Sequence, residues 1–134
     1  MNRLMLLLFL PLVLFASTAL AEDKIGVDLM NDSGATRVVK VSIYSSPGGS
    51  DYMEETLGDT RQTRFAIPSG PKTESELTFE IRNDRSEILS HVYVTCSEGK
   101  CQPTQVGEGV QYYVVEGGKS FALHLVKDDV PTKQ

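Results

Sequence analysis

Two cysteines, Cys96 and Cys101, are the reactive side chains whose spacing is most informative. The residues between them, Ser97 to Lys100, are turn-forming, and the pair is spaced more widely than the C-x-x-C of redox-active sites. In an oxidising compartment, two cysteines this close in the chain most simply join each other. The spacing therefore predicts a structural disulfide across a tight hairpin, worth about 2 kcal/mol of stability. A redox-active pair is the alternative.

Residues that could carry catalysis are present but not in a recognisable arrangement. The two histidines, His91 and His124, do not lie at zinc-finger spacing, and no G-x-S-x-G nucleophile motif occurs. The adjacent carboxylates at 54–55 and 128–129 are neighbours in sequence, so on a strand their side chains would point to opposite faces. We predict no catalytic residue, no cofactor and no enzymatic activity.

Asp28, Asn31 and Asp32 lie around an expected turn, and their oxygens are the kind of ligand that Ca²⁺ takes. Their spacing does not match the EF-hand loop, which ends in a glutamate. Asn and Asp are also common turn residues because their side chains hydrogen-bond the nearby backbone. We expect these residues to shape a turn, and we predict no metal site.

The first 21 residues have the composition of a cleavable signal peptide. Arg3 provides a positive start, positions 4–16 form an apolar run of 13 residues, and Ala19 and Ala21 are the small residues before the expected cut. A transmembrane helix needs about 20 apolar residues, so this run is short for an anchor. The sequence predicts a periplasmic or secreted protein with no membrane anchor after cleavage.

Cleavage would leave Glu22 at the new N-terminus, where a lipoprotein would carry a cysteine. The remaining 113 residues suffice for one domain, expected at 22–127 and followed by a flexible polar tail at 128–134. This part loses Arg3 from the 13 Lys and Arg and keeps all 18 Asp and Glu, so its formal charge is −6. Because the basic residues are dispersed, we expect neither nucleic acid nor an anionic membrane surface as a partner.

Apolar and polar residues alternate in a series of short segments, which is the pattern of half-buried strands. These segments lie at 25–29, 39–43, 64–67, 77–82, 88–96, 110–116 and 119–126. Residues 45–50 are expected to form a flexible loop, and residues 52–57 either a short edge strand or a helical turn. The pattern predicts an all-β fold, an antiparallel immunoglobulin-like β-sandwich of seven or eight strands, with a small β-barrel as the alternative.

The dipeptide Gly117-Gly118 predicts a tight hairpin between the last two strands, with Glu116 opposite Lys119. This register places six apolar residues on one inward face. The resulting pairs are Val110 with Leu125, Tyr112 with Leu123, and Val114 with Phe121.

The outward residues of the last strands form the most unusual surface that the sequence predicts. If segment 88–96 shares a sheet with the final hairpin, the outer face is more apolar and aromatic than a solvated surface usually is. The residues of this possible partner surface are Leu89, His91, Tyr93, Tyr113, Ala122 and His124. An edge strand could also recruit an extended peptide, whereas segment 45–60 could instead cover the face.

These patterns favour a small soluble exported protein-binding module without catalytic activity, acting on another exported protein as an adaptor, inhibitor or assembly chaperone. Two alternatives stay open. One is an enzyme or a small-ligand-binding protein with a site in the loops of the sandwich. The other is a structural subunit of a surface assembly, built by strand exchange.

Overall fold

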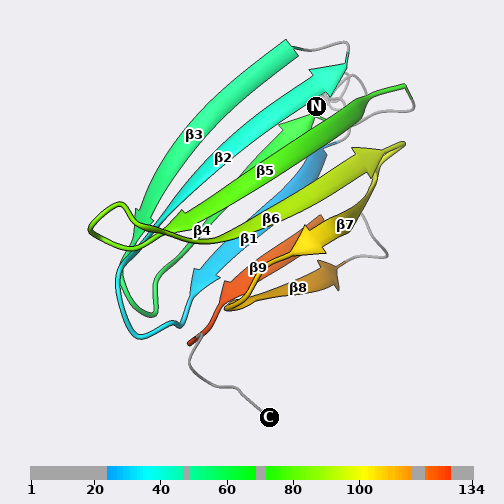
Figure 1. The fold of residues 1–134 in the computed structure, drawn as a ribbon. Helices are drawn as coiled ribbons and strands as arrows, with labels where there is room; N and C mark the ends of the chain where they lie inside the picture. The colour runs from blue at the N-terminus through cyan, green and yellow to red at the C-terminus, as the bar shows by residue number, and fades with distance from the viewer. Residues whose placement is uncertain (1–23, 47–48, 69–71, 116–119, 128–134) are drawn as a thin grey trace, which may run out of the picture.

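The computed structural model describes residues 24–46, 49–68, 72–115 and 120–127. Every regular element in these ranges is a β-strand (Figure 1). The strands are β1 Lys24–Asn31, β2 Arg37–Ser46, β3 Gly49–Leu57, β4 Gln62–Pro68, β5 Glu74–Arg82, β6 Ile88–Ser97, β7 Lys100–Val106, β8 Val110–Val115 and β9 Ser120–Leu125. No helix able to cross a membrane occurs among the described residues. The expected leader at 1–21 and tail at 128–134 lie outside them.

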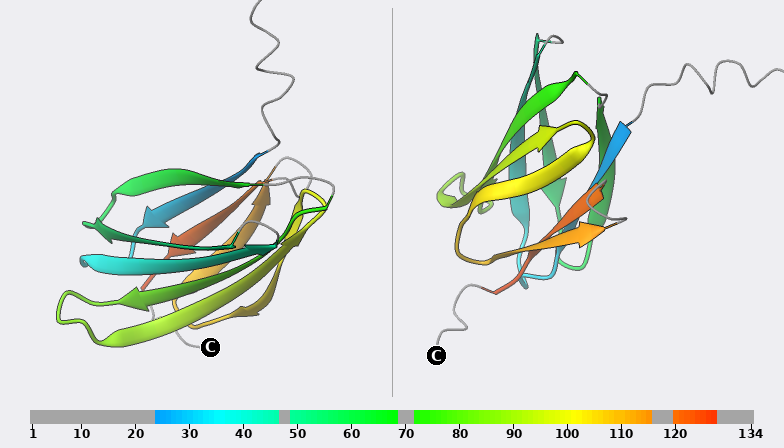
Figure 2. Two further views of the ribbon diagram at one scale, coloured as in Figure 1. Left: turned by 90° about the horizontal axis from the view of Figure 1, so that it is seen from above. Right: turned by 90° about the vertical axis from the view of Figure 1, so that its right-hand side faces the viewer.

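The nine strands form two sheets that face each other (Figure 2). One sheet has the order β4-β1-β9-β8, and the other has the order β3-β2-β5-β6-β7. The all-β prediction is confirmed, and the described sheets are not closed into a barrel. Segment 52–57 lies in β3, the edge strand that was one of its two predicted alternatives, paired with β2. The described strands exceed the predicted seven or eight because β7, after the cysteine turn, was not among the predicted segments. The loop predicted at 45–50 is correspondingly shorter, since β2 continues to Ser46.

The sequence predicted an antiparallel fold, but one strand pair is parallel. β1 pairs in parallel with β9, from Gly26 opposite Ser120 to Asn31 opposite Leu125, and antiparallel with β4 on its other side. The first and last strands of the described chain are therefore neighbours inside one sheet. The alternation of apolar residues shows which face of a strand is wet, but it carries no information on the direction of its neighbour.

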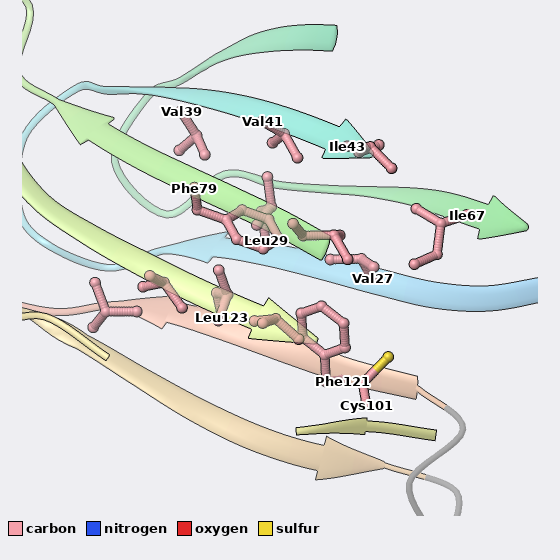
Figure 3. Packing of buried hydrophobic residues seen from close by; sticks show 14 of the residues in the cluster. Val27, Leu29, Val39, Val41, Ile43, Ile67, Phe79, Cys101, Phe121 and Leu123 are labelled. Carbon is pink, nitrogen blue, oxygen red and sulfur yellow. The ribbon is translucent and has the colours of Figure 1, made fainter. Parts of the chain in front are cut away.

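The core lies between the two sheets and consists of the inward residues that the alternation predicted. Val27 and Leu29 of β1 face Val41 of β2 and Phe79 of β5 across the sandwich (Figure 3). Phe79 and Phe121, from opposite sheets, meet edge to face with ring centroids 6.1 Å apart. Edge-to-face contact is a favoured arrangement of aromatic rings, because the positive edge of one ring meets the negative face of the other.

The predicted disulfide between Cys96 and Cys101 is confirmed, and it joins opposite residues of the β6–β7 hairpin. Both half-cystines are buried. Glu98 and Gly99, in the turn, have positive φ angles of 54° and 80°. The disulfide closes the end of the hairpin and anchors β7 at the edge of its sheet.

Replacing both cysteines with serine is expected to lower the free energy of unfolding by about 2 kcal/mol, since the closed loop is short. Urea denaturation of the variant and of the oxidised wild type measures the difference. If the two midpoints agree, the disulfide has no structural role.

Candidate strand-binding edge

The six residues predicted to form one partner surface are distributed over two sheets. β6 belongs to the five-stranded sheet, whereas β8 and β9 belong to the four-stranded sheet. His91 and Tyr93 therefore lie on one outer face, and Tyr113 and His124 lie on the other. The assumption that these strands share a sheet is wrong, because the chain crosses between the layers at 107–109.

The remaining two residues also differ from the prediction. Leu89 lies at a β-bulge, because the register with β5 shifts between Ile81 and Arg82. Ala122 is buried although it lies opposite Tyr113. Segment 49–57, considered as a possible cover, pairs with β2 in the other sheet and does not lie over β8.

The outer face of the five-stranded sheet is a polar network around His91 and Tyr93, whose rings stack at 6.0 Å. Glu80 Oε1 accepts a hydrogen bond of 2.9 Å from Arg82 Nε, and Glu80 Oε2 lies 3.7 Å from His91 Nε2. The hydrogen bond from Arg82 lowers the pKa of the Glu80 carboxyl, against a smaller opposing effect of desolvation. Because Glu80 and Arg82 bond each other beside His91, the surroundings of these rings are polar, unlike the apolar row that the sequence suggested.

A shallow hollow of about 430 Å³ lies on the same face, over β5, β6 and β7. Its lining includes the carboxylate of Glu76, the ring of Tyr93 and the hydroxyls of Thr78, Thr95 and Thr104. Its lining includes neither histidine nor serine. Elsewhere among the described residues, no three His, Cys, Asp or Glu side chains gather closely enough to hold a metal ion.

The three oxygen-bearing residues around the first turn have three different partners. Asp28 Oδ1 lies 3.6 Å from Arg64 Nε, and Asp32 Oδ2 lies 2.6 Å from His124 Nε2. Asn31 is fully buried and holds two turns together. Its Nδ2 donates to the carbonyl oxygens of Ala35, Leu57 and Gly58, while its Oδ1 accepts from the backbone and hydroxyl of Ser33. Asn31 thus shapes turns as expected, whereas Asp28 lies within β1 and is paired across the sheet with Arg64.

The four edge strands of the two sheets differ in how they are protected. β3 carries three carboxylates, β4 carries Arg64 and Pro68, and β7 carries Pro103 and the disulfide. Charges, prolines and irregularities at an edge prevent another strand from pairing with it. β8, with the sequence VQYYVV, has no charge, no proline and no register shift with β9.

β8 also exposes apolar side chains on both of its faces. Tyr113 and Val115, on the outer face, are 47% and 38% exposed. Val114 faces the core side, yet it is 60% exposed, whereas its cross-strand neighbour Phe121 is fully buried. The predicted hairpin register is thus confirmed where it is described. β9 is therefore buried between the sheets at Phe121, whereas β8 is exposed at Val114.

The hydrogen bonds of the hairpin show which backbone groups β8 presents at its open side. Val126 N donates to Gly109 O at 2.9 Å, so residues 109 and 126 form a hydrogen-bonded pair. Such pairs alternate along an antiparallel ladder. The N–H and C=O groups of Val110, Tyr112 and Val114 therefore point away from β9. No other described strand pairs with them.

Tyr112 anchors β8 to the core through its ring, which stacks on Phe121 at a centroid distance of 5.0 Å. Its hydroxyl is buried and has no hydrogen-bond partner among the described residues. Burial raises the pKa of Tyr112 from 10.0 to about 12, because it disfavours the phenolate.

Tyr112→Phe is expected to raise the free energy of unfolding by about 1 kcal/mol, because it removes a buried hydroxyl without a partner. Between pH 10 and about 12, the folded wild type keeps the phenolic proton of Tyr112, whereas the unfolded chain loses it. The stability linked to this proton is present below pH 10 and is lost as the pH rises to about 12. Urea denaturation across this range should show a steeper decline for wild type than for the variant. Parallel declines would contradict the assignment.

Sequence reasoning located the hairpin but did not single out β8 as an open edge. The signal was available in part, since 110–115 lacks any charged residue or proline. Its position at the edge depends on sheet order, which the sequence does not reveal. A scan against family models and a search of curated proteins gave no match to this chain.

Proposed function

We propose that this chain is a small soluble exported binding module without catalytic activity, periplasmic or secreted, that takes an extended segment of another exported protein onto β8. The observation that carries the proposal is the uncharged, unprotected β8 edge with exposed Tyr113, Val114 and Val115. The disulfide and the signal-peptide composition of residues 1–21 support an exported location. The module would act as an adaptor, an inhibitor or an assembly chaperone.

Strand addition suits this edge better than docking on a sheet face does. An added strand gains backbone hydrogen bonds from the free groups of Val110, Tyr112 and Val114, and those bonds do not depend on the partner's sequence. Specificity would come from the side chains on either side of the added strand. Tyr113 lies on the outer face and Val114 on the core side, so both faces of the partner segment would meet apolar surface.

A matched pair of tyrosine substitutions tests this proposal. Tyr113→Ser removes an exposed ring from β8, whereas Tyr93→Ser removes a ring from β6 on the opposite outer face. We expect Tyr113→Ser to weaken partner capture about tenfold, since a contacting aromatic ring contributes about 1.5 kcal/mol. Tyr93→Ser should leave capture unchanged.

The measurement is a quantitative pull-down from an extract of the compartment to which the protein is exported, with the partners identified by mass spectrometry. Thermal unfolding of each variant checks that the fold is intact. If folded Tyr113→Ser captures the same proteins in the same amounts as wild type, β8 is not the binding edge.

A further inference from the structure

The free backbone groups of β8 are arranged so that the strand is complementary to itself. We infer that, without a partner, the β8 edge is covered by β8 of a second copy in a closed two-fold dimer. This inference rests on the proposed function, because it names an occupant of the same edge. The dimer would protect the edge until a partner segment replaces the second copy.

The backbone geometry selects one register for this pairing. In an antiparallel ladder, the residues whose N–H and C=O groups point outward must lie opposite one another in hydrogen-bonded pairs. With the two-fold axis at Tyr112, Tyr112 faces itself and Val110 of each copy faces Val114 of the other. All three outward-pointing residues of each strand are then paired. With the two-fold axis at Tyr113, Tyr112 of each copy would face Val114 of the other. Val110 would then face a residue beyond the end of β8 and would have no partner within that strand.

The side chains agree with this register. Val114, which is 60% exposed although it faces the core side, would pack against Val110 of the second copy. On the outer face, Gln111 would lie opposite Tyr113. No charge would be buried, because β8 contains none. The two cores would lie on the same side of one continuous sheet of eight strands, formed by the four strands of each copy.

The net charge of the chain determines how salt affects the dimer, and the two-fold symmetry limits the assembly to two copies. The chain carries a formal charge of −5, and −6 without its leader, so the two bodies repel each other and added salt should strengthen the association. The interface is isologous and uses only β8, so it closes at two copies. The opposite edge, β4, carries Arg64 and Pro68, which oppose further strand pairing. A growing polymer, as in the surface-assembly alternative, is not expected.

Sedimentation velocity of the purified protein from about 1 to about 500 μM tests the inference, a range chosen because a small interface of this kind dissociates readily. Wild type should shift from monomer to dimer as its concentration rises. Added salt should lower the protein concentration at which the dimer forms. Val114→Lys should weaken dimerisation at least about 100-fold, because the docked strand would bury an unpaired ammonium group. Ile88→Lys adds the same charge at a residue 49% exposed on β6, and it should dimerise like wild type.

Disulfide crosslinking tests the register without relying on the lysine variant. Residues 111 and 113 of opposing copies would form a non-hydrogen-bonded pair, whose Cα atoms lie about 4.5 Å apart, within reach of a disulfide. A mixture of Gln111→Cys and Tyr113→Cys proteins should therefore crosslink faster than either protein alone. Faster crosslinking of Tyr113→Cys alone would overturn the register.

Three outcomes would overturn the dimer: a wild type that stays monomeric throughout, a folded Val114→Lys protein that dimerises like wild type, or species larger than a dimer. These failures are distinguishable from failure of the proposed function. A monomeric wild type that still captures a partner through Tyr113 overturns the dimer alone. A dimer whose dissociated chains capture nothing overturns the proposed function alone.

Discussion

Val114→Lys is expected to weaken binding of the partner segment by about 100-fold while leaving the fold intact. In the free protein the lysine ammonium can reach water, because Val114 is 60% exposed. Stability should therefore change by no more than about 0.5 kcal/mol. When a strand docks on β8, the ammonium loses water without gaining a carboxylate, which costs about 3 kcal/mol.

Isothermal titration calorimetry with the partner recovered by pull-down measures this effect. Ile88→Lys is the matched control, since it places the same charge on a comparably exposed aliphatic residue away from β8. Equal affinity of Val114→Lys and wild type would show that the partner binds elsewhere.

Asn31→Ala is expected to cause the largest loss of stability, about 4 kcal/mol. The substitution leaves the carbonyl oxygens of Ala35, Leu57 and Gly58, and the backbone N–H of Ser33, without the side chain that now pairs with them. Each buried polar group that loses its partner costs about 1–3 kcal/mol. Ala35 O keeps a hydrogen bond from Ser33 Oγ, and Gly58 O keeps one from Arg61 N, so the loss is smaller at these two oxygens. The first turn and the β3–β4 turn should loosen together.

Asn83→Ala is the control for this prediction. Asn83 Oδ1 also accepts from two turn N–H groups, those of Arg85 and Glu87, but these bonds are exposed to water. Its loss should cost about 1 kcal/mol, because water can replace the missing bonds. Urea denaturation compares the two variants. If the two substitutions lower the free energy of unfolding equally, burial of the Asn31 hydrogen bonds adds nothing to stability.

Local features of this fold could be predicted from the sequence because they depend on neighbouring residues. The alternation of Leu77, Phe79 and Ile81 identified inward positions, and all three are buried. The spacing of Cys96 and Cys101 identified the disulfide. In each case the deciding interaction lies within one strand or one hairpin.

The features that could not be predicted depend on how distant segments combine. Alternation does not reveal that β6 and β8 lie in different sheets, nor that β1 and β9 pair in parallel. The exposure of Val114 is a further example. Its inward direction was predicted correctly, but its burial depends on how far the opposite sheet extends over β8. The binding edge follows from that global arrangement.

Amide hydrogen exchange along β8 tests the open edge most directly. In the dilute monomer, the amides of Tyr112 and Val114 should exchange rapidly because they point away from β9, whereas those of Gln111 and Tyr113 should be protected by it. Docking of a partner strand should then protect Tyr112 and Val114 as well. Equal protection of all four amides in the monomer would mean that the edge is already covered, and would contradict the account.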